Sequence, residues 1–224
     1  MNDQQRIDLQ SSYDRVAAEY ARRIFDELAD KPFDRELLDR FAARLKDAGI
    51  VCDMGCGPGQ IARYLHERGV TALGVDLSPG MIEHARRLNP GLDFQTGDML
   101  ALNVADEAWA GIAAFYSIIH IPRDEVLTAL RELRRVLCSG GLLLLAFHLG
   151  DETLHVDEWW GHPVSADFEL VRLDEMEHYL RAAGFEIEST IERAPYPDVE
   201  HQSRRGYILA RRPINSKVDN TGLS

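Results

Sequence analysis

The amino-acid sequence predicts an α/β protein in which helices cover both faces of a mostly parallel sheet. Between residues 50 and 147, short apolar runs alternate with segments of helical period, which is typical of right-handed βαβ units around a parallel sheet. The last two apolar runs are joined by residues 192–205, which contain proline and are too few for a crossover helix. These two strands are therefore expected to pair as an antiparallel hairpin at one edge of the sheet.

Two amphipathic helices are expected ahead of the first strand, at residues 12–28 and 34–48. In each segment apolar residues recur at helical spacing along one face. Gly49 ends the second helix, because glycine readily adopts the backbone conformation that follows a helix. The apolar faces consist of Tyr13, Val16, Ala17, Tyr20 and Ile24 in the first helix, and of Leu37, Leu38, Phe41 and Leu45 in the second.

Alternating strands and helices account for the rest of the core. Strands are expected at residues 50–54, 70–75, 92–96, 109–116 and 142–147, and helices at residues 60–68, 79–88 and 123–136. A further helix at residues 173–183 ends at Gly184, and strands at residues 185–191 and 206–211 form the edge hairpin. Residues 150–169 and 192–205 fit no core element, and loops this long in a compact domain are more often functional than idle.

The composition indicates a single domain over residues 1–212, followed by a flexible polar tail at residues 213–224. The 224 residues are 45% hydrophobic, which suffices for one core, and the formal net charge of −12 would repel a nucleic acid. The N-terminus lacks the apolar stretch of a signal peptide, and the longest apolar run is too short to span a membrane. The three cysteines form neither a CxxC pair nor a disulfide framework. We therefore expect a cytoplasmic protein without a nucleic-acid or membrane partner, and its oligomeric state stays open.

The glycine-rich stretch VCDMGCGPGQ, at residues 51–60, follows the first strand and opens a helix. Ligands of open α/β sheets bind beyond the carboxyl ends of the strands, so the backbone N–H groups of this turn are expected to face a ligand. Gly55, Gly57 and Gly59 do not match the G-x-G-x-x-G pyrophosphate fingerprint, because Gln60 stands at its third glycine. Asp53 would also repel a pyrophosphate, and it suits an amino-bearing ligand better.

Two more acids follow strand ends, Asp76 after the second strand and Asp98 after the third. A carboxylate at Asp76 can bind both ribose hydroxyls, and one at Asp98 can accept a hydrogen bond from an adenine amino group. Asp76 could instead cap the next helix, but Ser78, which precedes a proline, is the better cap. Asp98 could instead be part of a Gly-Asp turn. Three acids at successive strand ends indicate a nucleoside with an attached amine and no phosphate, as in S-adenosylmethionine.

With these motifs the sequence resembles the class I S-adenosylmethionine-dependent methyltransferases, especially the small-molecule branch that includes ubiquinone-biosynthesis-type enzymes. The matching motifs are VCDMGCGPG, GVDLSPGMIEHAR, TGDM, AAFYSIIHIP and LRRVLCSGGLLLLAF, in the expected order between residues 12 and 148. The resemblance implies a Rossmann-like sheet of seven strands whose last strand runs antiparallel.

The resemblance also implies which residues bind the cofactor. Asp53 and the glycine loop would hold the methionine part, and Asp76 would hold the ribose. Asp98 and Met99 would contact the adenine, with Met81 or Ile82 on its other face. The expected set is Tyr13, Tyr20, Asp53, Met54, Gly55, Cys56, Gly57, Asp76, Leu77, Met81, Gly97, Asp98, Met99, Tyr116 and Ser117.

Four of the candidate residues allow two interpretations each. Tyr13 and Tyr20 either pack the first helix onto the core or fold over the cofactor. His120 follows the fourth strand, where the methyl donor should meet its acceptor, and a neutral imidazole there could accept a proton from a hydroxyl substrate. The alternative is a histidine hydrogen-bonded to the backbone, and the same choice applies to His148. We expect both histidines to contact the acceptor, with His120 as the candidate base.

The segments outside the core supply the remaining candidates for acceptor binding. Trp159 and Trp160 form either a lid over the pocket or a packing anchor for their loop. The second segment contributes Arg193, Tyr196, Arg204 and Arg205. These residues either border the pocket, where the arginines could bind an anionic group of the acceptor, or belong to a solvated loop. The acids and histidines of residues 151–162 match no metal-ligand spacing, so no metal site is expected.

We therefore predict an enzyme that moves a methyl group from S-adenosylmethionine to a small-molecule acceptor by in-line displacement, leaving S-adenosylhomocysteine. Such a reaction needs alignment and exclusion of water rather than a catalytic triad. The N/D-P-P-Y/F/W signature of amino-group methylation is replaced by FYSI at residues 115–118, which favours oxygen or carbon as the acceptor atom. Two alternatives stay open: a non-catalytic module that binds S-adenosylmethionine, and a nicotinamide-dependent oxidoreductase, against which the glycine register and Asp53 argue.

Overall fold

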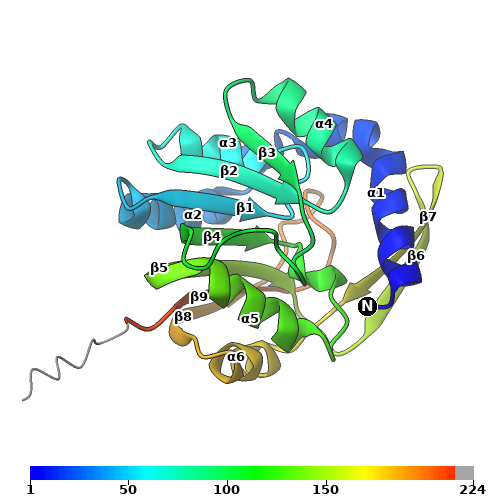
Figure 1. Ribbon diagram of the computed structural model, residues 1–224. Helices are drawn as coiled ribbons and strands as arrows, with labels where there is room; N and C mark the ends of the chain where they lie inside the picture. The colour runs from blue at the N-terminus through cyan, green and yellow to red at the C-terminus, as the bar shows by residue number, and fades with distance from the viewer. Residues whose placement is uncertain (215–224) are drawn as a thin grey trace, which may run out of the picture.

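A seven-stranded sheet forms the centre of the computed structural model, which describes residues 1–214 (Figure 1). Its strands in chain order are β1 (Ile50–Met54), β2 (Thr71–Asp76), β3 (Asp93–Thr96), β4 (Trp109–Phe115), β5 (Leu137–His148), β8 (Glu186–Arg193) and β9 (Arg205–Arg211). In space they run in the order β3-β2-β1-β4-β5-β9-β8. The first five are parallel, and β9 lies antiparallel between β5 and β8. The predicted parallel sheet and its antiparallel edge hairpin are confirmed. Residues 215–224, most of the tail that the sequence predicts to be flexible, lie outside the described residues.

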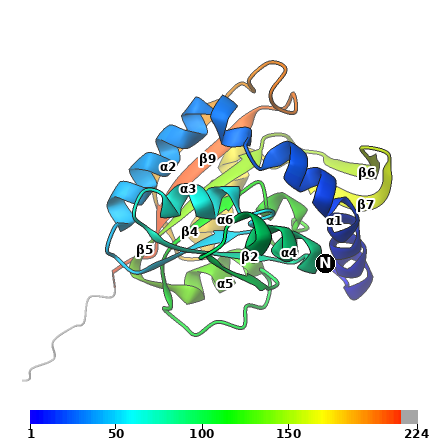
Figure 2. The same ribbon diagram turned by 90° about the horizontal axis from the view of Figure 1, so that it is seen from above.

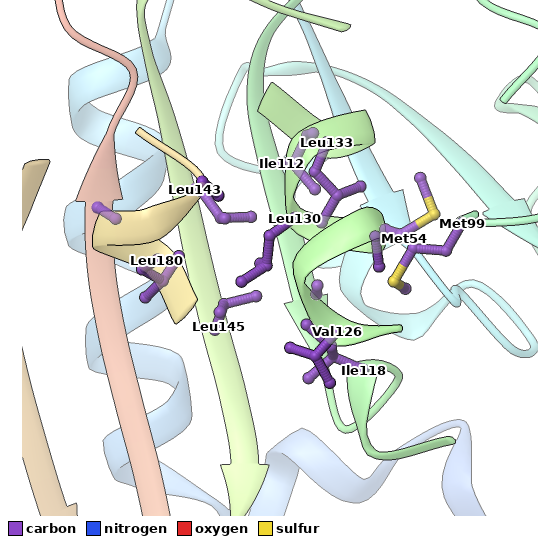
Figure 3. Close-up of a cluster of buried hydrophobic side chains, with 14 of the residues drawn as sticks. Met54, Met99, Ile112, Ile118, Val126, Leu130, Leu133, Leu143, Leu145 and Leu180 are labelled. Carbon is purple, nitrogen blue, oxygen red and sulfur yellow. The ribbon is translucent and has the colours of Figure 1, made fainter. Parts of the chain in front are cut away.

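Helices cover both faces of this sheet, and apolar side chains on each face pack against them. Helices α2 (Pro32–Leu45) and α3 (Gln60–His66) pack on one face, with α4 (Pro79–Leu88) beside α3. Helices α5 (Val126–Val136) and α6 (Leu173–Ala182) pack on the other. In β5, Leu142 and Leu144 face α2, whereas Leu143 and Leu145 face α5 and α6. Figure 3 shows the leucines of α5 and α6 against those of β5. A strand buried on both faces reads as a continuous apolar run, which is why its position could be predicted.

Helix α1 (Asp3–Ile24) begins nine residues before the start expected at residue 12. The side chain of Asn2 accepts a hydrogen bond from the Gln5 backbone N–H, and the Gln5 side chain accepts one from the Asn2 N–H, both at 2.9 Å. This reciprocal cap satisfies two N–H groups that would otherwise lack partners, so the helix extends to residue 3. The expected end at residue 28 is also wrong, because α1 stops at Ile24 and a short 3-10 helix η1 (Glu27–Asp30) follows.

Residues 150–169, expected to be a loop, form an antiparallel hairpin of β6 (Thr153–Trp159) and β7 (His162–Glu169). Its turn is Trp160–Gly161, and both residues have positive φ, 52° and 81°, as the tight turns of hairpins require. Val164 and Ala166 are buried, while Ser165 between them is exposed. The hairpin lies outside the sheet, beside α1 and beyond the carboxyl ends of the parallel strands (Figure 2).

Helices in residues 1–214 are either too short or too polar to cross a membrane.

Candidate functional site

A cavity of about 500 Å³ lies beyond the carboxyl ends of β1, β2, β4 and β5. The chain leaves β1 toward β2 on one side and returns to β4 on the other, so the cavity sits where the strand order reverses. Open α/β sheets bind their ligands at such positions. Helix α1 and the β6–β7 hairpin cover the cavity, and it is lined mainly by apolar side chains among which a few polar groups converge.

The glycine loop forms the floor of the cavity between β1 and α3. A Cβ atom on Gly55, whose φ is +71°, would lie 2.2 Å from the Cβ of Ser117, so only glycine lets the loop approach the end of β4. The N–H groups of Gly55 and Cys56 donate to the carbonyl of Val75 at 2.7 and 3.0 Å. The Gly57 N–H donates to Asp76 at 2.8 Å. These three N–H groups therefore serve the protein itself, and the expectation that they face a ligand is wrong.

Asp53 is the most deeply buried acid of the cavity, with 1% of its surface exposed. Its Oδ2 accepts a hydrogen bond from the Ala62 N–H at 2.9 Å. Burial, with smaller contributions from Asp76 and Glu27, raises the pKa of Asp53 to about 8. Beside it, Gln60 donates to Glu27 at 3.0 Å, while its buried Oε1 meets no donor among residues 1–214. Lys31 is paired with Glu27, so among residues 1–214 Asp53 has no cationic partner and Gln60 Oε1 has no donor. A ligand ammonium would supply both the donor and the positive charge.

Asp76 holds the loop and lines the cavity at the end of β2. Besides the Gly57 N–H it accepts the Ser78 N–H, at 2.9 Å. Burial raises the pKa of Asp76 to about 6, although these backbone N–H groups lower it. Ser78 caps α4 by accepting the Met81 N–H at 3.0 Å, so Asp76 does not act as the cap.

Asp98 lines the cavity at the end of β3, but the protein already engages both of its oxygens. Arg6 of α1 donates to Oδ2 at 3.0 Å, and the Leu100 N–H donates to Oδ1 at 2.8 Å. Met99 lines the same end of the cavity. Met81 lies outside the lining, because it is fully buried among Val16, Ala17 and Val164 beneath α1.

Tyr13 and Tyr20 of α1 both line the cavity and also pack on Trp159, so packing does not keep either side chain away from the cavity. The Tyr13 hydroxyl lies 2.6 Å from His120 Nε2, and His120 Nδ1 lies 2.9 Å from the Asp167 carbonyl oxygen. A carbonyl only accepts, so Nδ1 carries the proton, Nε2 accepts, and the tyrosine donates. Burial lowers the pKa of His120 to about 4, which keeps the imidazole neutral.

Most of the predicted site residues line the cavity, and four of them do not. All the residues expected to bind the cofactor line the cavity except Met81; of those expected to bind the acceptor, His120, His148 and Trp159 line it. Trp160 stacks on Trp159 with ring centroids 4.8 Å apart but lies outside the lining. Tyr196 accepts the Phe33 N–H at 3.2 Å, and Arg204 is exposed and paired with Glu192. Neither of these two lines the cavity.

Several polar residues of the cavity fall outside the expected set. They include Glu27, Lys31, Gln60, Glu200, His201 and Arg205. The sequence indicates Arg205 only as a residue that could border the pocket, yet it begins β9 directly opposite His148 in the register with β5. Pairing the last strand with β5 would have revealed it, because residues paired across antiparallel strands lie side by side.

Comparison with known proteins finds similarity over part of this chain. Residues 51–141 match a family model described as "Methyltransferase domain". Over 151 residues the chain is 29% identical to malonyl-[acyl-carrier protein] O-methyltransferase of Enterobacter lignolyticus. The aligned part covers 65% of this chain and 58% of that protein. Over 104 residues the chain is 38% identical to methyltransferase GfsG of Streptomyces halstedii. This aligned part covers 43% of this chain and 36% of that protein.

This chain therefore spans only part of the length of these curated relatives. Among solved structures, the CcbJ methyltransferase from Streptomyces caelestis has a TM-score of 0.69 at 18% identity. The comparison covers 92% of this chain and 99% of that one, so the two share their fold over nearly the whole chain.

Proposed function

We propose that this chain is an S-adenosylmethionine-dependent methyltransferase, as the match of residues 51–141 to a methyltransferase domain indicates. It transfers the methyl group of S-adenosylmethionine to a small-molecule acceptor. The observation that carries the proposal is the pair of buried polar groups at one end of the cavity. Asp53 lacks a cationic partner there, and Gln60 Oε1 lacks a donor within the described chain. An ammonium group would satisfy both, whereas the loop N–H groups that a pyrophosphate would need are already engaged.

The residues of the cavity fit this cofactor. Asp53 and Gln60 would hold the amino group of its methionine part, and Asp76 would accept hydrogen bonds from the ribose hydroxyls. Asp98 and Met99 would border the adenine, which requires that Asp98 share its oxygens with Arg6. When bound, S-adenosylmethionine supplies a methyl group that is already activated on a sulfonium.

The chain itself supplies alignment, exclusion of water and an acceptor for one proton. Helix α1 and the β6–β7 hairpin close the cavity from above, and Tyr13, Tyr20 and Trp159 form its aromatic wall. As an acceptor oxygen takes the methyl group, its proton passes to His120 Nε2, either in place of the Tyr13 hydroxyl or through it. The Asp167 carbonyl fixes the imidazole tautomer that leaves Nε2 free of a proton.

Calorimetric titration with S-adenosylmethionine and S-adenosylhomocysteine tests the proposal. Both ligands should bind the wild type, and Asp76→Ala should weaken both by about 10-fold to 100-fold, the cost of charge-assisted hydrogen bonds to two hydroxyls. Asp93→Ala removes an exposed acid at the start of the neighbouring strand β3 and should leave the affinities unchanged. Circular dichroism checks that the variants are folded. Equal affinities for the wild type and Asp76→Ala would refute the assignment of the ribose site.

Transfer is measured separately, with S-adenosylmethionine labelled in its methyl group and a panel of hydroxyl and carbon-acid acceptors. Binding without transfer to any acceptor would favour the non-catalytic module. Transfer confined to RNA or protein would contradict a small-molecule acceptor.

A further inference from the structure

The guanidinium of Arg205 is buried at the end of the cavity next to β5 and β9, away from the glycine loop. Arg205 opens β9 beside His148 of β5, and only 3% of its side chain is exposed. Both residues line the cavity. Arginine is rarely buried unless its charge and its N–H groups are matched by partners, so each partner matters.

The hydrogen bonds of Arg205 account for only part of its donors. Nη1 donates to the carbonyl and the hydroxyl of Ser203 at 2.6 and 2.7 Å, and to His148 Nδ1 at 3.1 Å. The buried Nε has no hydrogen-bond acceptor in the part of the chain that the structure describes. All the partners that Nη1 finds are neutral.

The nearest carboxylate is engaged elsewhere. Glu200 lies 3.8 Å from Arg205 Nε, beyond hydrogen-bonding distance. Its oxygens accept two hydrogen bonds from Arg193, at 2.7 and 2.8 Å, and one from the Tyr196 N–H at 2.8 Å. Arg193 therefore takes the fork-to-fork pairing with Glu200, and the charge of Arg205 has no hydrogen-bonded anion among residues 1–214.

His148 contributes a second side chain with an N–H donor to the lining of the cavity. Because Arg205 can only donate, His148 Nδ1 accepts, and the proton of the neutral ring is on Nε2. The Tyr116 ring lies beside both groups, with its centroid 5.1 Å from that of His148 and 5.5 Å from the Arg205 guanidinium carbon. Lys31 lies 5.6 Å from the same ring, but Glu27 neutralises its ammonium. Tyr116 itself has a φ of +53°, a strained conformation for a tyrosine that is characteristic of binding sites.

We propose that the methyl acceptor carries a carboxylate, which Arg205 and His148 receive beside the ring of Tyr116. This inference rests on the proposed function and specifies its substrate class. A singly charged carboxylate suits the site better than a phosphate dianion, because the Glu200 carboxylate lies next to the guanidinium. Cofactor and acceptor share one cavity of about 500 Å³, so the part of the acceptor that enters must be small.

The test compares matched pairs of an acid and its amide, with S-adenosylhomocysteine bound to the protein. Benzoate, 4-hydroxybenzoate and hexanoate, each with its primary amide, are titrated by calorimetry, and inorganic phosphate is a separate arm. In the wild type at least one acid should bind about tenfold or more tightly than its amide, the effect of a charge-assisted hydrogen bond. Arg205→Met should abolish this preference, and His148→Phe, which keeps an aromatic ring on Tyr116, should reduce it.

Arg204→Met is the matched control, because Arg204 is the exposed neighbour of Arg205 and lies outside the cavity. It should keep the preference for acids. The affinity for S-adenosylhomocysteine reports independently on the cofactor site and on folding, and Arg205→Lys restores a charge if the methionine variant does not fold.

Absence of an acid preference in a wild type that binds S-adenosylhomocysteine overturns the carboxylate and leaves the proposed function standing. The carboxylate is likewise overturned if Arg205→Met keeps the preference, or if phosphate alone binds. Failure of the wild type to bind S-adenosylhomocysteine counts instead against the proposed function.

Discussion

Among single side chains, Asp53 shows how the fold prepares a charge for a ligand. Burial raises its pKa to about 8, and the neighbouring carboxylates of Asp76 and Glu27 add to this effect. Between about pH 4 and pH 8 the folded protein therefore binds more protons at this position than the unfolded chain does. Its contribution to stability falls as the pH rises through that window, so the ligand-free domain bears a cost that a cationic partner would remove.

Cofactor binding should release protons through Asp53. An ammonium beside the carboxylate favours its ionised form, so Asp53 loses its proton when the cofactor binds, and affinity should rise from pH 6 toward about pH 7.5. Calorimetry at pH 7 in phosphate and in Tris, whose ionisation enthalpies differ, gives the number of protons released, and we expect close to one. Asp53→Asn keeps the size of the side chain and should eliminate both effects. Equal binding enthalpies in the two buffers would contradict this assignment.

At the scale of the elements, α1 is held to the domain because one of its side chains caps another helix, α4. Asp14 of α1 accepts the Gly80 N–H at 2.8 Å and the Ser78 hydroxyl at 2.5 Å, both at the N-terminus of α4. A Cβ atom on Gly80 would lie 3.1 Å from the Asp14 Cα, so the absence of a side chain allows the two helices to approach. The carboxylate also lies where the α4 dipole favours a negative charge.

Asp14→Ala should destabilise the docking of α1 by about 1 kcal/mol, the usual cost of losing a cap residue. Urea unfolding measures the free energy, and hydrogen exchange shows whether the loss is local to residues 3–24. Asp8→Ala serves as the control, because it removes an acid of the same helix whose side chain binds Gln4 of α1 and no other residue of the described chain. A loss spread evenly over the sheet, or an equal loss in Asp8→Ala, would count against the inter-helix cap.

The elements themselves could be predicted where the sequence signal was strong on its own. Strand β1 and helix α4 have the predicted bounds, because the first is an apolar run buried on both faces and the second begins at Ser78-Pro79. The β6–β7 hairpin was missed because it buries only one face, chiefly with Val164 and Ala166, and its Trp-Gly turn is an unusual signal. The early start of α1 could have been found from the capping pair Asn2 and Gln5.

At the scale of the whole molecule, the two ends of the cavity differed in how far the sequence could predict them. Asp53, Asp76 and His120 lie at or shortly after the carboxyl ends of strands that share one edge, so parallel topology alone brings them together. Lys31, Glu200 and Arg205 come from segments about 170 residues apart and meet only through the antiparallel pairing of β9 with β5. The cover is equally non-local, since Ser12 of α1 accepts the Ser165 N–H of β7 at 2.8 Å.

This link predicts that α1 and the β6–β7 hairpin behave as one cover that the cofactor stabilises. With S-adenosylhomocysteine at about 100 times its Kd, binding adds about 2.7 kcal/mol to any opening that releases the ligand. Hydrogen exchange should therefore slow by up to about 100-fold in residues 3–24 and 153–169 together. Ser12→Ala should leave the protection of α1 and diminish that of the hairpin, and Ser11→Ala, at an exposed position, should not. If α1 alone gains protection in the wild type, the hairpin moves independently, and the site must admit its acceptor without displacing the helix over the cofactor.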